Sequence, residues 1–385
     1  MRIDAVWLHR VRIPFSGSFG HALSERRHSD AVFVQLRDEQ GGDGWGEILP
    51  RSYVTGETLE GVLERSGPAV AQRLLGAQLG DRIAVEAWID QTLAQVGRDL
   101  ATFGGFEIAL LDRAGRRFGV SLADWIGGEP GASESLGPAL PPGVIIGFEV
   151  KTDALKKHCI GLRWKGHTHV KVKVGLPDDA ERLAVITRVF GPKVPLRLDA
   201  NMAWTVDEAV QRLRSLSQIP IASIEQPVAA DDLAGMHTIR ERTGVAVMAD
   251  EAICSLDDAQ RLARAQAADI FNIRVGKHGG IRATRAIVEC ARQAEISIHL
   301  GTLVGESGVL SRVAEVFGRC VPGFACLDGK GQNRFLLEED VLALPSADAK
   351  NPAVHAALDR PGLGVDVNPE VIGRLRMGDP IELRA

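Results

Sequence analysis

Alternation of polar and apolar residues marks short strands along the chain, most clearly at 169–175, where the residues are HVKVKVG. Side chains two positions apart in a strand share one face, so Lys171 and Lys173 point the same way. A surface strand could carry this pattern without any function. In a buried strand, two ammonium groups would enter a confined space, which calls for a chemical reason.

Residues 1–126 have the pattern of an α+β domain. Residues 30–38 alternate, and the turn GGDG joins them to the strand-like WGEIL at 45–49, which predicts a hairpin. Helical spacing follows, notably at 103–119, where the pattern ends at a glycine. A segment rich in glycine, proline and serine at 127–143 predicts a linker.

A different rhythm fills residues 140–327, where β-rich runs alternate with helical stretches and begin about every 25 residues. Eight units of this length favour a closed β/α barrel over the alternative, an open doubly wound sheet, and no GxGxxG motif opens the region. The predicted strands are 143–148, 168–175, 195–199, 221–225, 245–250, 269–275, 296–301 and 323–327.

The composition is that of an ordinary globular protein, with 385 residues, 45% of them hydrophobic, and a net charge of −5. Because it has no basic run and no apolar stretch of about 18–20 residues, we expect neither a nucleic-acid nor a membrane partner. The N-terminal residues lack the apolar core of a signal peptide, and the five cysteines form no CxxC pair. Both features predict a cytoplasmic protein with reduced thiols.

Charged residues recur where the predicted strands end, which is the functional face of such a barrel. Lys173 ends one strand. The next three strands end with Asp199, Glu225 and Asp250, and Lys277 follows the strand after those. The successive intervals are 26, 26, 25 and 27 residues, one βα unit each. We therefore expect one charged group per unit at the same height around the mouth of the barrel.

Three carboxylates that converge in a low dielectric would repel one another, and a divalent cation relieves that repulsion. Oxygen ligands favour Mg²⁺ first and Mn²⁺ second, which makes Asp199, Glu225 and Asp250 the candidate ligands. A single acid at such a place could equally be a helix cap or a surface ion pair. Asn201 and Glu251 lie next to the predicted ligands in the sequence and are expected to support those ligands or to bind the substrate.

The lysines suit the same chemistry. Two close ammonium groups disfavour each other's charge, so one lysine can be neutral near pH 7 and accept a proton. Lys173 is the better base because it is nearer the strand end. Lys171 would lower the pKa of Lys173 and contact a substrate carboxylate. Lys277 would face both across the mouth. A metal beside a base suits removal of an α-proton and stabilisation of the resulting enediolate.

These residues resemble the enolase superfamily, in its muconate-lactonizing-enzyme subgroup, over nearly the whole chain. The resemblance rests on GWGEILP, TGET, FEIALLDRAGRRFG, Lys171-Val-Lys173, Asp199-Ala-Asn201, Glu225-Gln-Pro227, Asp250-Glu251 and Lys277-His-Gly-Gly280. It implies a modified TIM barrel, (β/α)7β, at 140–327. It also implies an α+β capping domain at 1–126, completed by the C-terminal segment 328–385.

The resemblance further implies that Asp199, Glu225 and Asp250 bind Mg²⁺. Lys173 and Lys277 would be acid/base residues on opposite faces of the substrate, and the protein would form homo-oligomers. Members of the subgroup include cycloisomerases, o-succinylbenzoate synthases, N-acylamino acid racemases and dipeptide epimerases.

Several positions bear on the choice among these members. Mandelate-racemase-type enzymes pair a histidine on the seventh strand with an aspartate on the sixth. Here Lys277 takes the sixth-strand place, so His299 is predicted to be a packed or supporting histidine.

Dipeptide epimerases carry Asp-x-Asp after the last strand, whereas this chain has Cys326-Leu-Asp328, which weakens that assignment. Glu306 is either a polar contact of the site or an acid favoured by a helix N-terminus.

Two segments of the capping domain are expected to set specificity. Residues 15–30 contain Arg26, and residues 50–57 contain Tyr53, the only tyrosine. Both have the composition of mobile loops that close over the barrel mouth, or of plain surface turns. An arginine there would suit an anionic distal group on the substrate.

The predicted function is Mg²⁺-dependent abstraction of the proton α to a carboxylate of a small molecule. The favoured outcome is racemisation or epimerisation of an amino acid derivative or dipeptide. A cycloisomerase or an o-succinylbenzoate synthase-like lyase stays open, as does a dehydratase of an acid sugar or hydroxy acid. The alternative outside enzymes is an inert binding or structural barrel, against which the complete set of acids and lysines argues.

Overall fold

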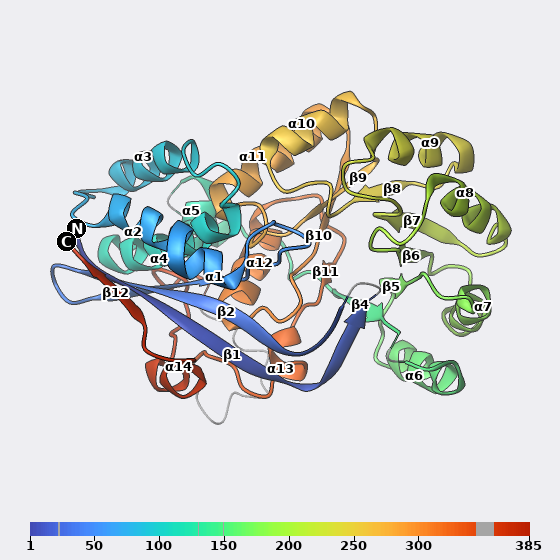
Figure 1. Cartoon of the computed structure of the whole chain (residues 1–385), viewed down its shortest axis with the longest axis horizontal. Coiled ribbons are helices and arrows are strands. Elements are labelled where there is room, and N and C mark those ends of the chain that lie inside the picture. The colour runs from blue at the N-terminus through green and yellow to red at the C-terminus, as the bar shows by residue number, and fades with distance from the viewer. Residues whose placement is uncertain (22–23, 130, 149, 344–357) are drawn as a thin grey trace.

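The computed structural model describes residues 1–21, 24–129, 131–148, 150–343 and 358–385. It contains an antiparallel sheet with its helices, here called the cap, and a closed barrel beside it (Figure 1). Both ends of the chain belong to the cap and lie close together. The C-terminal strand pairs with the N-terminal one, with Ala5 opposite Arg384.

The cap sheet has the strand order β12-β1-β2-β3, with β1 at Ile3–His21, β2 at Ser24–Asp38, β3 at Asp43–Ile48 and β12 at Ile381–Arg384. The predicted hairpin is confirmed, since Val34 of β2 lies opposite Gly46 of β3. The prediction of a loop at 15–30 is wrong. Over the described residues this segment continues β1 and β2, and Phe19 pairs with Arg26 beyond a bulge. A two-stranded ribbon is held together by backbone hydrogen bonds, which do not depend on the side chains. Its glycine and serine residues are more typical of loops, so the composition did not indicate strands here.

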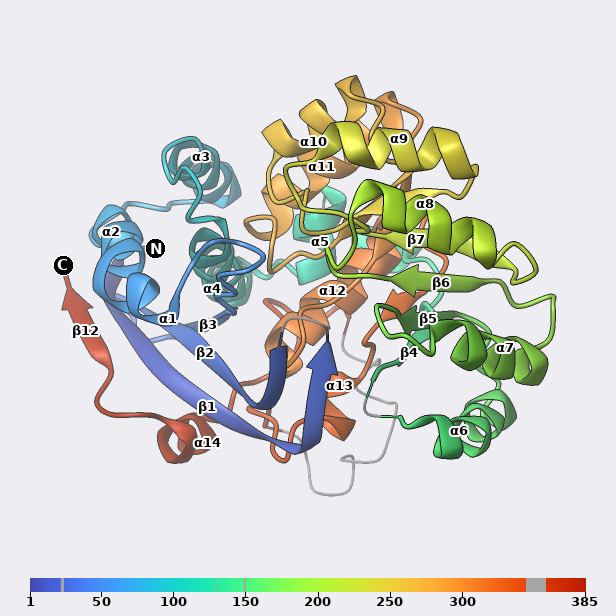
Figure 2. The ribbon, with the colours of Figure 1, turned by 45° about the vertical axis from the view of Figure 1, so that its right-hand side comes forward.

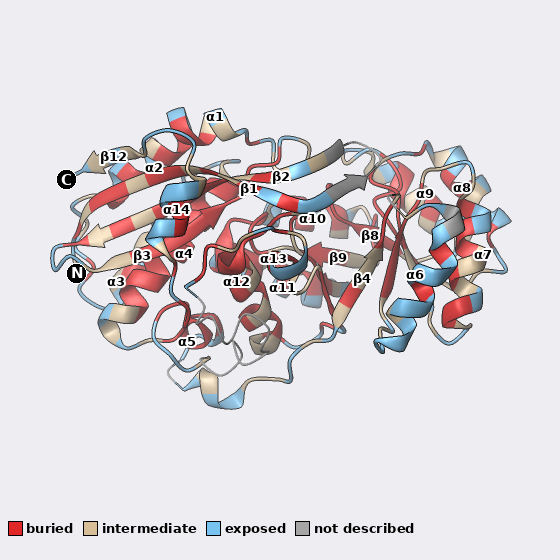
Figure 3. Cartoon of the chain, turned by 90° about the horizontal axis from the view of Figure 1, so that it is seen from below, coloured by how far each residue is buried: buried red, intermediate tan, exposed pale blue. Residues whose placement is uncertain are grey.

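Helix α4 packs on β2 and β3 and forms the centre of the cap (Figure 3). The helix predicted at 103–119 is confirmed, although it begins earlier, and Gly119 ends it with a left-handed φ of +72°. A Cβ on Gly46 would lie 2.0 Å from the carbonyl oxygen of Gly105, so the glycine lets helix and strand touch. The helices before the barrel are α1 Leu59–Gly61, α2 Gly67–Leu74, α3 Arg82–Leu93, α4 Leu100–Phe118 and α5 Leu122–Gly127, with a π-helical turn at Val62–Ser66 and a 3₁₀ turn at Ala132–Ser135.

Eight parallel strands of the described residues close the barrel in the order β10-β11-β4-β5-β6-β7-β8-β9, and helices surround it (Figure 2). The strands are β4 Pro142–Ile146, β5 Val170–Lys173, β6 Leu196–Asp199, β7 Ile221–Glu225, β8 Val247–Ala249, β9 Ile270–Ile273, β10 Ser297–Leu300 and β11 Leu327–Asp328. Between them lie α6 Thr152–Trp164, α7 Asp179–Phe190, α8 Val206–Ser215, α9 Leu233–Thr243, α10 Leu256–Arg264, α11 Gly280–Gln293 and α12 Gly308–Cys320.

The alternation of seven helices with these strands confirms the predicted (β/α)7β barrel with a capping domain. After the barrel, α13 at Gln332–Phe335 and α14 at Pro369–Leu375 lead back to the cap. All five cysteines are free thiols. In the part of the chain that the structure describes, every helix is too short or too polar to cross a membrane.

We predict that Arg113→Met lowers the free energy of unfolding by about 3 kcal/mol, because Asp38 becomes a buried charge without its partner. Arg113 Nη2 and Nε lie 2.6 Å and 2.9 Å from Asp38 Oδ2. Denaturant unfolding measures the loss. In the exposed pair of Arg65 and Asp99, Arg65→Met should cost less than about 1 kcal/mol. Equal losses in the two variants would contradict the prediction.

Candidate active site

Strand β5 is buried along its whole length, so both of its lysines enter the barrel: Lys171 is 3% exposed and Lys173 is 7% exposed. Lys171 Nζ lies 2.7 Å from both Asp199 Oδ2 and Glu225 Oε2. Lys173 Nζ lies 2.7 Å from Asp199 Oδ2 as well. The ammonium groups therefore face carboxylates from the next two strands.

The register of the barrel sets Lys173, Asp199 and Glu225 at one height. Lys173 is opposite Asp199 in the β5–β6 ladder, and Asp199 is opposite Glu225 in the β6–β7 ladder. Asp250 follows β8 directly. The three acids are completely buried. The ladders therefore bring Lys173, Asp199 and Glu225 side by side. Asp250, in contrast, lies two residues beyond Met248, the residue opposite Glu225. Arg274, which contacts both Glu225 and Asp250, links the third acid to the other two.

Lys277, in the turn after β9, approaches the acids from the other end. Its Nζ lies 2.8 Å from Asp250 Oδ1 and 2.7 Å from the Asp250 carbonyl oxygen. Arg274 and Lys277 outweigh the burial of Asp250 and lower the pKa of its carboxyl. The acids thus form a row in strand order, with Lys173 at one end and Lys277 at the other.

Two residues that the sequence analysis missed complete the row. Arg274 pairs with Asp250 and lies 3.4 Å from Glu225 Oε1, while Asn272 Nδ2 donates to the same oxygen at 2.9 Å. The signal for both was present in the sequence. In DIFNIRV, Asn272 and Arg274 alternate with apolar residues and so share the inner face of the strand.

The acids differ in their electrostatic environment. Burial alone would raise the pKa of Asp199, but Lys171 and Lys173 outweigh it and lower the pKa to about 2. The pKa of Glu225 is raised, by burial first and by the charge of Asp199 next. The pKa of Lys171 is also raised, because Asp199 and Glu225 outweigh its burial. Lys171 is therefore a fixed cation.

Asn201 and Glu251 lie beside the acids, and their predicted roles in supporting the ligands or binding the substrate stay predictions. Lys173 donates to Asn201 Oδ1, and Asn201 Nδ2 donates to Glu251 Oε1 at 3.0 Å. Asn201 has a left-handed φ of +43°, a strained conformation that is typical of functional loops. Burial first, and the charge of Asp250 next, raise the pKa of Glu251 to about 7.

Glu251 also lines a cleft between the barrel and residues 52–57 of the cap. Tyr53 lines the same cleft. The guanidinium of Arg26 stands 5.6 Å from the centre of the Tyr53 ring. These two predicted specificity residues therefore lie together on the cap side of the cleft.

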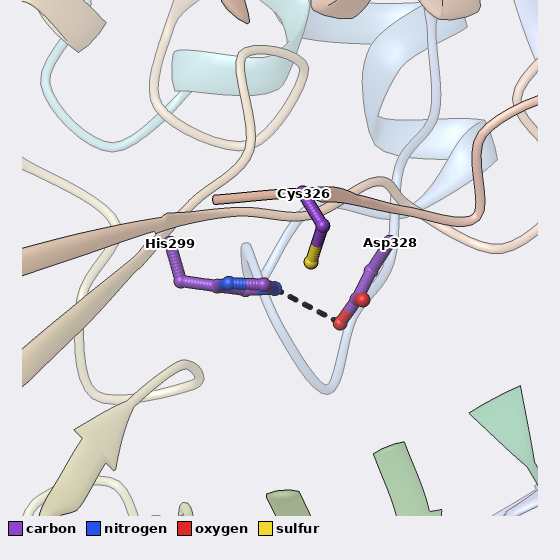
Figure 4. A group of neighbouring side chains, drawn as sticks. All are labelled: His299, Cys326 and Asp328. Carbon is purple, nitrogen blue, oxygen red and sulfur yellow. Dashed lines mark ion pairs between the residues drawn. The ribbon is translucent and has the colours of Figure 1, made fainter. Parts of the chain in front are cut away.

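His299, Cys326 and Asp328 form a second buried group, drawn in Figure 4, whose ligand atoms lie within 4.8 Å of one another. Arg197 Nη2 and Nη1 lie 2.6 Å and 2.7 Å from the two Asp328 oxygens, and Nη1 lies 2.7 Å from His299 Nε2. Burial lowers the pKa of His299. A guanidinium thus takes the place that a metal ion would need. His299 Nε2 also lies 3.0 Å from Asp328 Oδ2, and its role as a packed or supporting histidine stays a prediction.

Glu306 is buried in the loop between β10 and α12. Its Oε1 accepts a hydrogen bond from the Leu303 amide at 2.7 Å, and its Oε2 has no hydrogen-bond partner among the described residues. Burial raises its pKa to about 8, and nearby Glu47 adds to the rise. Ser307, rather than Glu306, caps α12. Glu306 directly precedes this cap, and both of its predicted roles, a polar contact of the site and an acid favoured by a helix N-terminus, stay predictions.

Comparison with known proteins gives consistent matches. A family profile described as enolase C-terminal domain-like matches residues 154–371. The o-succinylbenzoate synthase of Bacillus subtilis (strain 168) is 25% identical over 374 residues, which are 97% of this chain and 96% of that protein. Other curated relatives are named as epimerases, a racemase and a chloromuconate cycloisomerase.

Two solved structures show the same fold. N-succinyl Arg/Lys racemase from Bacillus cereus ATCC 14579 has a TM-score of 0.84 at 23% identity and covers 100% of both chains. A dipeptide epimerase from Enterococcus faecalis V583, complexed with Mg and L-Leu-L-Tyr, has a TM-score of 0.78 at 24% identity. That match covers 95% of this chain and 100% of the epimerase chain.

We expect Glu306 to make the protein less stable as pH rises. Its pKa is about 8 in the folded protein against an ordinary value of 4.5. A raised carboxyl pKa gives stability that is complete below the unfolded value and is lost as pH rises through the folded value. From pH 5 to pH 9, the unfolding free energy of wild type should therefore fall by about 4 kcal/mol more than that of Glu306→Gln.

Denaturant unfolding at the two pH values measures this difference. Glu64→Gln, at an exposed position, is the control and should follow wild type. Parallel pH profiles for wild type and Glu306→Gln would show that the carboxyl does not titrate in this way.

Proposed function

The chain is an enzyme that belongs to the enolase superfamily, and from this premise we propose that it transfers the proton α to a substrate carboxylate in a Mg²⁺-dependent reaction. The observation that carries the proposal is the row of Asp199, Glu225 and Asp250 with a lysine at each end. Two proton-transfer groups at opposite ends of one anionic row can serve opposite faces of a planar intermediate.

The lysines have distinct roles in this proposal. Lys173 as the neutral amine takes the α-proton from one face of the substrate, which leaves a planar enediolate. Lys277 as the ammonium gives a proton to the same carbon from the other face, and the configuration is inverted. Lys171 keeps its charge, because it lies 2.7 Å from two carboxylates, and it balances the anions throughout.

Asp199, Glu225 and Asp250 would hold the Mg²⁺ ion. The residues fit that ion, since all three offer carboxylate oxygens, which Mg²⁺ prefers. The raised pKa of Glu225 reflects burial and repulsion from Asp199, and a cation would relieve the repulsion. When bound, Mg²⁺ would supply positive charge beside the substrate carboxylate, where negative charge develops.

The substrate we propose is an amino acid whose nitrogen is acylated, rather than a dipeptide with a free ammonium group. Both oxygens of Asp328 are already engaged by Arg197, at 2.6 Å and 2.7 Å. The position two residues earlier, Cys326, supplies no second acid. Asp328 therefore offers an ammonium group no free carboxylate oxygen, whereas an acylated nitrogen needs none.

A β-elimination is the second candidate, because it begins with the same abstraction by Lys173. It is favoured by the relative named o-succinylbenzoate synthase, which aligns with nearly the whole chain. The two candidates differ in the fate of the carbon skeleton. Racemisation leaves it intact, whereas elimination expels a leaving group.

We predict that the enzyme with Mg²⁺ in D₂O incorporates deuterium at the α-carbon of an N-acylamino acid, which proton NMR detects. Lys173→Ala should slow exchange of one enantiomer and Lys277→Ala that of the other, each by about 10²- to 10⁴-fold. Lys165→Ala, at an exposed position, is the matched control.

The panel should also contain dipeptides, muconates and hydroxy acids. A new unsaturated product without deuterated substrate would favour the elimination. The absence of exchange and of product with every acid would refute the proposed reaction.

We also predict that Asp199→Asn, Glu225→Gln and Asp250→Asn each weaken Mg²⁺ binding by at least about tenfold, because each removes one anionic ligand. Isothermal titration calorimetry measures the affinity, and circular dichroism verifies that each variant is folded. Asp207→Asn, at a side chain that is 91% exposed, should bind Mg²⁺ as wild type does. Unchanged affinity in all three variants would place the ion elsewhere.

A further inference from the structure

A buried carboxylate of the cap contacts the barrel next to Lys277. Glu107 lies on α4 and is 1% exposed. It accepts hydrogen bonds from the first amides of α11, with the Ile281 amide donating to Oε2 and the Arg282 amide donating to Oε1 at 2.9 Å. Helix α11 begins at Gly280, three residues after Lys277. The cap therefore binds the end of the turn that carries this lysine.

The same turn is in direct contact with the backbone of α4. A Cβ on Gly104 would lie 2.7 Å from the Gly280 nitrogen and 3.1 Å from the Gly279 carbonyl carbon. A Cβ on Gly280 would lie 1.8 Å from Glu107 Oε2. Glycines on both sides let the helix and the turn approach this closely. Any shift of α4 would consequently move the turn.

A few short hydrogen bonds within the turn fix the position of Lys277 relative to the start of α11. The Lys277 amide donates to the Arg274 carbonyl at 2.9 Å, and the Gly280 amide donates to the Val275 carbonyl at 3.2 Å. His278 Nδ1 lies 3.1 Å from the Cys254 carbonyl oxygen. The segment is thus a compact unit that is held by α4 at one end and by the loop after β8 in its middle.

Lys173 has no such dependence on the cap. It belongs to β5, whose ladders with β4 and β6 fix the backbone of this strand within the barrel. The two lysines of the proposed reaction are therefore positioned by different parts of the molecule. A disturbance at the contact between α4 and α11 should affect one of them and spare the other.

We propose that Glu107 is a positioning residue that holds the Lys277 turn from the cap, so that proton transfer on the Lys277 face depends on this carboxylate. The inference rests on the proposed function for the assignment of faces. In that step a proton passes from the Lys277 ammonium to the α-carbon. The neutral amine that remains then regains a proton from solvent.

Another cap carboxylate provides a matched control. Glu47 of β3 is equally buried and accepts hydrogen bonds at the start of α12, from the Ser307 amide at 2.9 Å and the Leu310 amide at 3.2 Å. Glu107→Gln and Glu47→Gln therefore remove the same charge from two equivalent joints between cap and barrel. Only the first joint adjoins Lys277.

The first test measures deuterium exchange of each enantiomer of an N-acylamino acid by the Mg²⁺-loaded enzyme at pH 8.5. At this pH Glu107, whose pKa is raised to about 7 by burial, is ionised. Glu107→Gln should lower the rate on the Lys277 face relative to the Lys173 face by about tenfold or more. Glu47→Gln should leave the ratio of the two rates as in wild type. An unchanged ratio in Glu107→Gln would overturn the proposal.

A steric pair of variants tests the same contact without altering charge. Gly104→Ala should lower the same ratio, because its methyl group presses on the turn. In Gly105→Ala the added Cβ would lie 2.3 Å from Ile48 Cγ1, so the clash falls inside the cap, and the ratio should be preserved. If Gly104→Ala and Gly105→Ala changed the ratio of the two exchange rates equally, the contact between α4 and the turn would not act specifically on Lys277.

Backbone amide hydrogen exchange, followed by mass spectrometry, gives a readout that needs no substrate. Residues 277–282 should exchange at least about tenfold faster in Glu107→Gln than in wild type, and Glu47→Gln should instead affect residues 307–310. If wild type moves no α-proton of any acid, the proposed function fails and this measurement still decides the inference. Unchanged exchange at 277–282 in Glu107→Gln would then refute it.

Discussion

Compensation of buried charge at the mouth of the barrel is the constraint on which the rest of the structure depends. A charge removed from water is tolerated only when an opposite charge and hydrogen bonds meet it. Here three buried carboxylates are met by Lys171, Lys173, Lys277 and Arg274, which come from β5 and from the segment after β9. A one-residue slip in any strand between them would turn a charge away from its partners. The barrel register is thus tied to the chemistry.

Much of this arrangement could be predicted because it is local in the sequence. The alternation around Lys171 shows that both lysines share a face, and the spacing of about 25 residues shows that the acids recur in phase. The partners could not be predicted, because pairing joins distant positions. Arg197 and Asp328, which form a bidentate ion pair, are 131 residues apart. Arg197 stands two residues before Asp199 and so shares its face of the strand, but nothing local indicates which group it meets there.

The cap was harder to predict for a related reason. Helix α4 is buried on nearly all sides, because the cap sheet contacts one side of it and the barrel helix α11 contacts another. Its polar residues therefore make tertiary contacts, where helical periodicity alone would assign them to solvent. Glu107 and Arg113 both stand in FEIALLDRAGRRFG, yet one contacts the barrel and the other contacts β2 of the cap. The pairing of β1 with β2 within residues 15–30 was missed because backbone hydrogen bonds between strands require no particular side chains, so the sequence pattern did not indicate them.

Charged side chains also lie below the mouth of the barrel, where branched apolar side chains usually fill the interior. Arg197, Asp328 and His299 form a compensated group there, and a Cβ on Gly143 would lie 1.9 Å from an Asp328 oxygen, so the strand β4 closes tightly over it. This tight closure fixes Asp328 on Arg197 and keeps it from turning toward another cation. An acid that is satisfied in this way attracts a substrate ammonium group only weakly, because its field is already cancelled at short range. Under the proposed function, this buried ion pair in the interior of the barrel would therefore disfavour substrates with a free ammonium group.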